Sequence, residues 1–222
     1  MTSVSPSTLK FLKDLKRNNR RVWFHDHKAQ FEKARDDFAQ LVYELAEGVA
    51  NFDEEVKRVL SHERTVKIFR IYRDVRFSKD KTPYKTNFGG VIGPGGMKDG
   101  NPGYYLHIAP GESSVGGGLH MPDPKTLNRI RGSIDKDASR LRKVLASKEF
   151  KKHFKGINPY YTLKTVPRGF DKGHPAADLL KNKSFTASKH FSDSQVLKST
   201  FIKEALKSFK ALKPLVSYLR SV

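Results

Sequence analysis

Apolar side chains recur at helical spacing in several stretches of the chain. Near the N-terminus, Ser5 and Pro6 have the residue types of an N-cap and a first helical turn, and the short helix that they begin should stop at Asn18-Asn19. Further helices are predicted over 26–47, from 124 to about 147, over 176–180 and from 193 to about 219. Helices therefore flank a central region of different character.

That central region contains runs rich in Val, Ile, Phe and Tyr, as β-strands do. Strands are predicted over 65–77, 103–109, 114–121 and 184–191. The second and third form a hairpin around the turn 110–113, whereas the glycines between 89 and 100 predict a long loop. Strands joined by a hairpin, with helices before and after them, predict an α+β fold: a mainly antiparallel sheet with the N- and C-terminal helices packed on it.

Length and composition limit the class of protein. A chain of 222 residues with 11% aromatic residues can bury a core, so we expect one domain over 1–222, with residues 1–8 as a flexible tail. The absence of cysteine excludes disulfides, thiolate metal sites and a cysteine nucleophile. No apolar run reaches the ~18 residues of a membrane span and no signal-peptide layout is present, so we expect an intracellular protein, cytoplasmic or nuclear, without a membrane partner.

The charge is strongly positive and unevenly distributed. The chain has 43 Lys and Arg against 23 Asp and Glu, a formal net charge of +20, and residues 151–222 alone hold 15 basic and 4 acidic residues. Such an excess suggests an acidic partner, namely a nucleic acid, an anionic surface or a phosphorylated ligand. The alternative is a lysine-rich solvated surface that keeps the protein soluble.

The segment 70–85 is the most unusual part of the sequence. On a strand, alternate side chains share a face. One face would carry Arg70, Tyr72, Asp74 and Arg76; the other would carry Phe69, Ile71, Arg73, Val75 and Phe77. The single Asp74 can neutralise only one of three arginines, and arginine forks bind phosphate or carboxylate in a bidentate manner. The segment therefore predicts an anion site; the alternatives are an ion network with Glu54, Glu55 or Glu63, or an edge strand protected by charge.

The turn after this segment extends the basic cluster. Lys79, Lys81 and Lys85 flank Pro83 and could close over the same ligand. The residues that we expect to bind it are Arg70, Arg73, Arg76, Lys81, Tyr84 and Lys85. Aromatic residues alternate with these cations and could stack bases, which favours a nucleic-acid-binding module as the second hypothesis. A third possibility is a scaffold in which the Arg/Asp network is purely structural.

Two residues are candidates for acid–base chemistry. His107 shares a face with Tyr105 on its predicted strand, and Asp74 could orient the arginines opposite it. The alternative is a half-buried, hydrogen-bonded strand histidine. The residues His25-Asp26-His27 do not converge as metal ligands, and the HExxH, Walker and GxSxG motifs are absent, so we expect no metal and no cofactor. Whether the protein is an enzyme stays open at this point.

Four blocks of sequence carry a family resemblance. They are 11–28 with Trp23-Phe24, 70–85, Gly103-Tyr104-Tyr105-Leu106-His107-Ile108 with Gly116-Gly117-Gly118, and Pro167-Arg168-Gly169-Phe170-Asp171 with His174-Pro175. In this order they resemble the family named domain of unknown function 2461. The resemblance implies a single domain of bacteria and fungi without an agreed activity, and it adds Trp23 and Arg168 to the candidate ligand-binding residues.

Overall fold

Five strands form one antiparallel sheet in the computed structural model, which describes residues 3–61, 65–95 and 100–222. The strands are β1 (Val66–Ile68), β2 (Phe88–Ile92), β3 (Gly103–Ile108), β4 (Ser113–Leu119) and β5 (Phe185–Phe191). They lie side by side in chain order, each antiparallel to the next. This simple meander, together with the helices around it, confirms the predicted α+β class.

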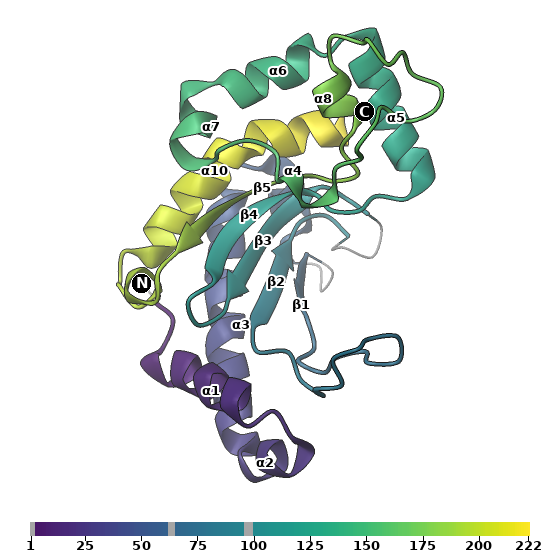
Figure 1. Cartoon of the computed structure of the whole chain (residues 1–222). Helices are drawn as coiled ribbons and strands as arrows, with labels where there is room; N and C mark the ends of the chain where they lie inside the picture. The colour runs from purple at the N-terminus through teal and green to yellow at the C-terminus, as the bar shows by residue number, and fades with distance from the viewer. Residues whose placement is uncertain (1–2, 62–64, 96–99) are drawn as a thin grey trace.

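In the sequence, helices precede the sheet, lie between β4 and β5, and follow β5 (Figure 1). They are α1 (Pro6–Arg17), α2 (Arg21–Asp26), α3 (Lys28–Ala50), α4 (Glu54–Val59), α5 (Pro124–Lys136), α6 (Ser139–Ala146), α7 (Lys148–His153), α8 (Ala177–Leu180), α9 (Asp193–Val196) and α10 (Phe201–Arg220), with a 3-10 turn at Pro159–Tyr161. The two longest, α3 and α10, pack against the same face of the sheet and bury the core.

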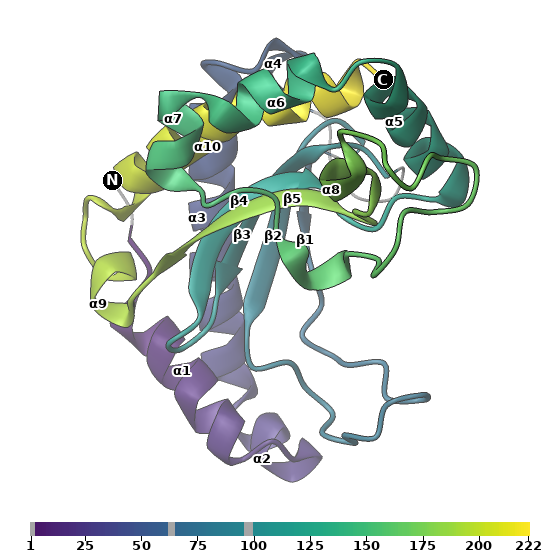
Figure 2. The same ribbon diagram turned by 45° about the horizontal axis from the view of Figure 1, so that its top comes forward.

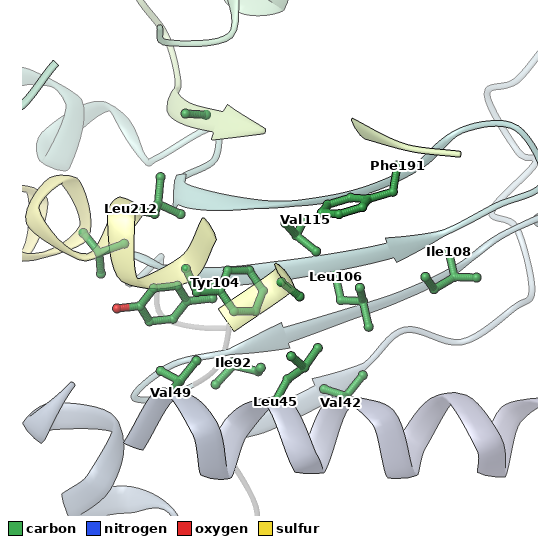
Figure 3. Close-up of a cluster of buried hydrophobic side chains, with 14 of the residues drawn as sticks. Val42, Leu45, Val49, Ile92, Tyr104, Leu106, Ile108, Val115, Phe191 and Leu212 are labelled. Carbon is green, nitrogen blue, oxygen red and sulfur yellow. The ribbon is translucent and has the colours of Figure 1, made fainter. Parts of the chain in front are cut away.

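The strand register divides the sheet into two chemically different faces. On the helix-covered face, Ile92 pairs with Tyr104, and Val42, Leu45 and Val49 of α3 lie against them (Figure 3). The opposite face carries polar side chains, because Lys67, Tyr105, His107, Ser114 and Ser188 occupy the alternate positions. Over β1 to β3, none of the described helices covers this face in either view (Figures 1 and 2). We call it the open face.

Two strand predictions are wrong for physical reasons. The glycines near residue 89 do not begin a loop: Phe88–Ile92 is the buried strand β2. A Cβ on Gly90 would lie 2.8 Å from Val42 of α3, and one on Gly89 would lie 2.7 Å from the Tyr105 hydroxyl. These glycines therefore permit close packing on both faces instead of forming a turn. The predicted strand 65–77 is also shorter than expected, since β1 ends at Ile68.

Helix boundaries also differ from the prediction. Trp23 and Phe24 belong to the separate helix α2, and the helices predicted over 124–147 and 193–219 are each broken in two. The first break occurs at Asp137, whose carboxylate accepts a hydrogen bond from the Ser139 amide and so begins α6. Residues 4–8 of the predicted tail are packed: Val4 is buried, its amide donates to the Val196 carbonyl, and Pro6 begins α1 behind the N-cap Ser5.

Candidate anion-binding site

Between β1 and β2 the chain makes a long irregular excursion, residues 69–87, which we call the basic loop (Figure 1). Its two arms are joined by a single bridge between Tyr72 and Tyr84 and by backbone hydrogen bonds from the Arg73 and Lys85 amides. Because this segment is not a strand, its side chains do not alternate between two faces. Phe77, predicted on the apolar face, is 95% exposed at the far end of the loop.

Most of the arginine charge in the basic loop is neutralised within it. Arg73 donates to Asp80 and Thr82. Arg76 donates two hydrogen bonds to the Asp74 carboxylate, from Nε at 3.0 Å and from Nη2 at 2.7 Å. The Thr82 amide and the Arg73 guanidinium lower the pKa of Asp80 to about 2. The imbalance of three arginines to one aspartate is therefore reduced to three to two, because Asp80 is a partner that strand alternation did not reveal, and Arg70 is left without an ion pair among the described residues. The alternative network with Glu54 and Glu55 does not form: these side chains face Lys57 and Arg220, and Glu63 lies outside the described residues.

Other predicted ligand residues are used in packing. Tyr84 is 6% exposed and stacks on Phe24 at 4.0 Å, while Asn19 bonds its backbone amide and carbonyl. Trp23 stacks on His27 at 4.0 Å. Lys81 donates to the Val75 carbonyl and so stabilises the loop itself. The stack of Tyr84 on Phe24 therefore anchors the basic loop to α2.

Arg168 lies far from this loop in the fold. It is exposed in the segment between the Pro159–Tyr161 turn and α8, which runs beside α5 and α8, whereas the basic loop extends from the opposite end of the sheet (Figures 1 and 2). The two segments that the sequence combined into one ligand site are therefore separated by the sheet.

On the open face, His107 lies in a hydrogen-bonded cluster. Its Nδ1 lies 3.1 Å from the Tyr105 hydroxyl and 3.4 Å from the Asn87 amide nitrogen. An amide nitrogen only donates, so Nδ1 accepts and the proton of the neutral ring resides on Nε2. Burial lowers the pKa of His107, Glu112 raises it and His190 lowers it further. Asp74, the other candidate for acid–base chemistry, lies in the basic loop and is bound to Arg76, one of the arginines that we expected it to orient.

Two lysines lie over the Phe69 ring beside this cluster, and the charge of Arg70 acts on one of them, Lys85. The Nζ atoms of Lys67 and Lys85 lie 5.9 and 5.7 Å from the centre of the Phe69 ring, and Lys85 donates to the Arg70 carbonyl at 3.1 Å. Phe69 in turn contacts Tyr105, with ring centres 6.2 Å apart. Burial lowers the pKa of Lys85, and the charge of Arg70 lowers it further. Within the described residues, none of these three cations forms an ion pair with a carboxylate.

The comparisons with known proteins bear on identity. A family model described as "Conserved hypothetical protein (DUF2461)" matches residues 7–218. The chain belongs to the DUF2461 family. This result confirms the resemblance seen in the four sequence blocks. Neither the curated proteins nor the solved structures provide a significant match, so the DUF2461 assignment brings no activity with it.

The site of this DUF2461 protein thus combines residues that the sequence identified with others that it did not. Arg70, Lys85 and His107 were predicted, and Phe69 was noted among the aromatic residues next to the basic cluster; Lys67 and Asn87 were missed. Lys67 lies on β1, but only its pairing with Val91 shows which face of the sheet it occupies. In the described part of the chain, His, Asp and Glu side chains do not gather in threes as a metal site requires, and no helix is both long and apolar enough to cross a membrane.

The tautomer of His107 is a direct test of this cluster. We expect the ring to stay neutral, with its proton on Nε2, somewhat below pH 6.5, because burial lowers its pKa from that ordinary value. Histidine 15N–1H correlation spectra across pH would show this. The Tyr105→Phe variant removes a hydrogen bond that the neutral ring accepts, so the pKa should rise toward 6.5. A proton on Nδ1 at pH 8 would contradict the assignment.

Proposed function

We propose that the protein binds a small phosphorylated ligand on its open face, between the cations around Phe69 and the His107 cluster. The observation that carries this proposal is the group of Lys67, Arg70 and Lys85, none of which forms an ion pair with a carboxylate among the described residues, although the charge of Arg70 lowers the pKa of the nearby Asp74. Three neighbouring cations repel one another, and a bound anion would remove that repulsion. A phosphate group offers the acceptors that ammonium and guanidinium groups bind best.

The polar cluster supplies the neighbouring contacts for such a ligand. The Nδ1 atom of His107 is occupied by hydrogen bonds with Tyr105 and Asn87, and its Nε2 atom carries the proton. In this state the ring can donate a hydrogen bond to a ligand from Nε2 but cannot take a proton at Nδ1. His107 would therefore act first as a hydrogen-bond donor. The neutral ring does not act as a general acid, because loss of the Nε2 proton would leave an imidazolate; that role requires the imidazolium, which carries a proton on both nitrogens.

Calorimetric titration with pyrophosphate, at constant ionic strength, tests the proposal. We expect saturable binding that weakens about ten- to a hundredfold in Lys85→Ala, because a hydrogen bond to a charged group contributes about 1.5–3 kcal/mol. Lys33→Ala is the matched control, since it removes one exposed lysine from α3, away from the open face. Equal binding by Lys85→Ala and wild type would show that the open-face cations do not hold the ligand.

A second candidate function rests on the end of the basic loop. Phe77 is 95% exposed and Arg76 lies 5.8 Å from the centre of its ring, a combination that suits stacking on the bases of single-stranded nucleic acid. A fluorescent single-stranded RNA would then bind with strong salt dependence and lose affinity in Phe77→Ala, not in Lys85→Ala. This opposite pattern of variants separates the two candidates.

A further inference from the structure

A pocket of about 230 Å³ lies where the ends of α4, α5 and α10 meet the connection between β2 and β3. The C-terminal end of α10, which lines the pocket, lies at the opposite end of the fold from the basic loop (Figure 1). The polar lining of the pocket includes Glu55, Asn101, Thr126, Arg129 and Arg220. Because a water molecule takes up about 30 Å³ in the liquid, the pocket has the volume of roughly eight waters. We call it the Arg220 pocket.

Arg220 is the unusual residue of this pocket. Its side chain is only 8% exposed; Nη1 binds both oxygens of the buried Asp53 at 2.9 and 3.0 Å, and Nε donates to the Pro102 carbonyl. Its Nη2 is the one buried side-chain nitrogen or oxygen without a hydrogen-bond partner in residues 3–61, 65–95 and 100–222. A buried donor on a charged group is costly to leave unpaired, so this atom requires an acceptor.

A second guanidinium lines the same pocket. Arg129 contacts the Thr126 hydroxyl at 3.5 Å, and among the described residues it has no carboxylate partner. Glu55 lies 3.6 Å from Nη1 of Arg220, which is a long contact, and its side chain is 54% exposed, so it can turn toward solvent. The pocket lining thus includes two guanidinium groups and a hydroxyl, together with the Glu55 carboxylate and Val222, while Asp53 behind Arg220 already pairs with that guanidinium.

We infer that the Arg220 pocket binds a small ligand through an oxyanion group, a carboxylate or a phosphate, which accepts from Nη2 of Arg220 and from Arg129. Guanidinium groups bind both oxyanions with strong, charge-assisted hydrogen bonds. Glu55 would leave the guanidinium as the ligand enters. This site is separate from the open face and does not depend on the function proposed there.

Arginine side-chain NMR provides a local measurement. Phosphate and acetate, each added to the wild-type protein at constant ionic strength, should shift the Nε–Hε signal of Arg220 and reach saturation. A larger effect of one salt identifies the preferred oxyanion. Binding at the open face would shift the NMR signals of His107 and not that of Arg220. A failure to observe binding at one site therefore leaves the test of the other site intact.

Three variants make the test specific. Arg129→Ala should lower the affinity for the oxyanion about tenfold, because one charge-assisted contact is lost. Glu55→Gln should raise the affinity, because the competing negative charge is removed. Lys136→Ala, which removes one exposed cation from the far end of α5, should leave it unchanged. The inference is overturned if the Arg220 signal does not shift with either salt, or if Arg129→Ala titrates like wild type. An identical response in Lys136→Ala and Arg129→Ala would also overturn it, since general screening would then explain the shift.

Discussion

Replacing Asp53 with asparagine should lower the free energy of unfolding by about 3–5 kcal/mol, because it leaves the Arg220 guanidinium buried without its charged partner. Asp53 is 1% exposed and also accepts from the buried Tyr104 hydroxyl at 2.7 Å. The Asp53 carboxylate caps α4 by accepting hydrogen bonds from the Glu55 and Val56 amides, and asparagine can still make this cap. The lost stability therefore reports the missing negative charge and not a missing cap. Chemical denaturation of the two proteins would measure the difference.

The control is Asp36→Asn, which removes the partner of Arg35 in an exposed pair and should change stability by less than about 1 kcal/mol. The pH dependence provides a second readout. Burial raises the pKa of Asp53, but hydrogen bonds from Tyr104 and Arg220 and the charge of Arg220 together hold it below the ordinary 3.8. The stability that this depressed pKa contributes is therefore present above pH 3.8 and lost as the pH falls through the folded-state value. An Asp53→Asn protein as stable as the control would contradict this account.

Replacing Tyr84 with alanine should also cost about 3–5 kcal/mol, as truncations of buried aromatic side chains do. The ring is stacked on Phe24 and its backbone is bound by Asn19, so this residue holds the basic loop against α2. We therefore expect faster hydrogen exchange at the Arg73 and Lys85 amides, which bridge the two arms of the loop. Denaturation and exchange measurements on the same variant would show both effects.

Tyr84→Phe separates packing from ligand binding. It keeps the ring and removes only the hydroxyl, so we expect it to resemble wild type in both stability and pyrophosphate binding. The prediction fails if Tyr84→Phe retains full stability but loses binding. That result would return Tyr84 to the ligand site, where the sequence first suggested it.

The sequence determined those features of the fold that depend on local patterns. The helical period of α1, with its Ser5 cap and Pro6, and the hairpin of β3 and β4 are each encoded within a few residues. The family could also be identified from short blocks, because the order of those motifs is a property of the chain itself. For the same reason Arg70, Lys85 and His107 could be identified from sequence as chemically unusual.

Only the tertiary structure decided what surrounds those residues. Asp80 neutralises Arg73 because the basic loop turns back on itself, and Asn87 reaches His107 because β2 pairs with β3. The glycines of β2 resembled a loop because their role, close approach to α3 and to Tyr105, depends on partners distant in the sequence. The same is true of Arg220, whose contact with Asp53 spans almost the whole chain. Local propensity sets the elements, but burial and pairing between distant segments set which charges are neutralised and which are available to a ligand.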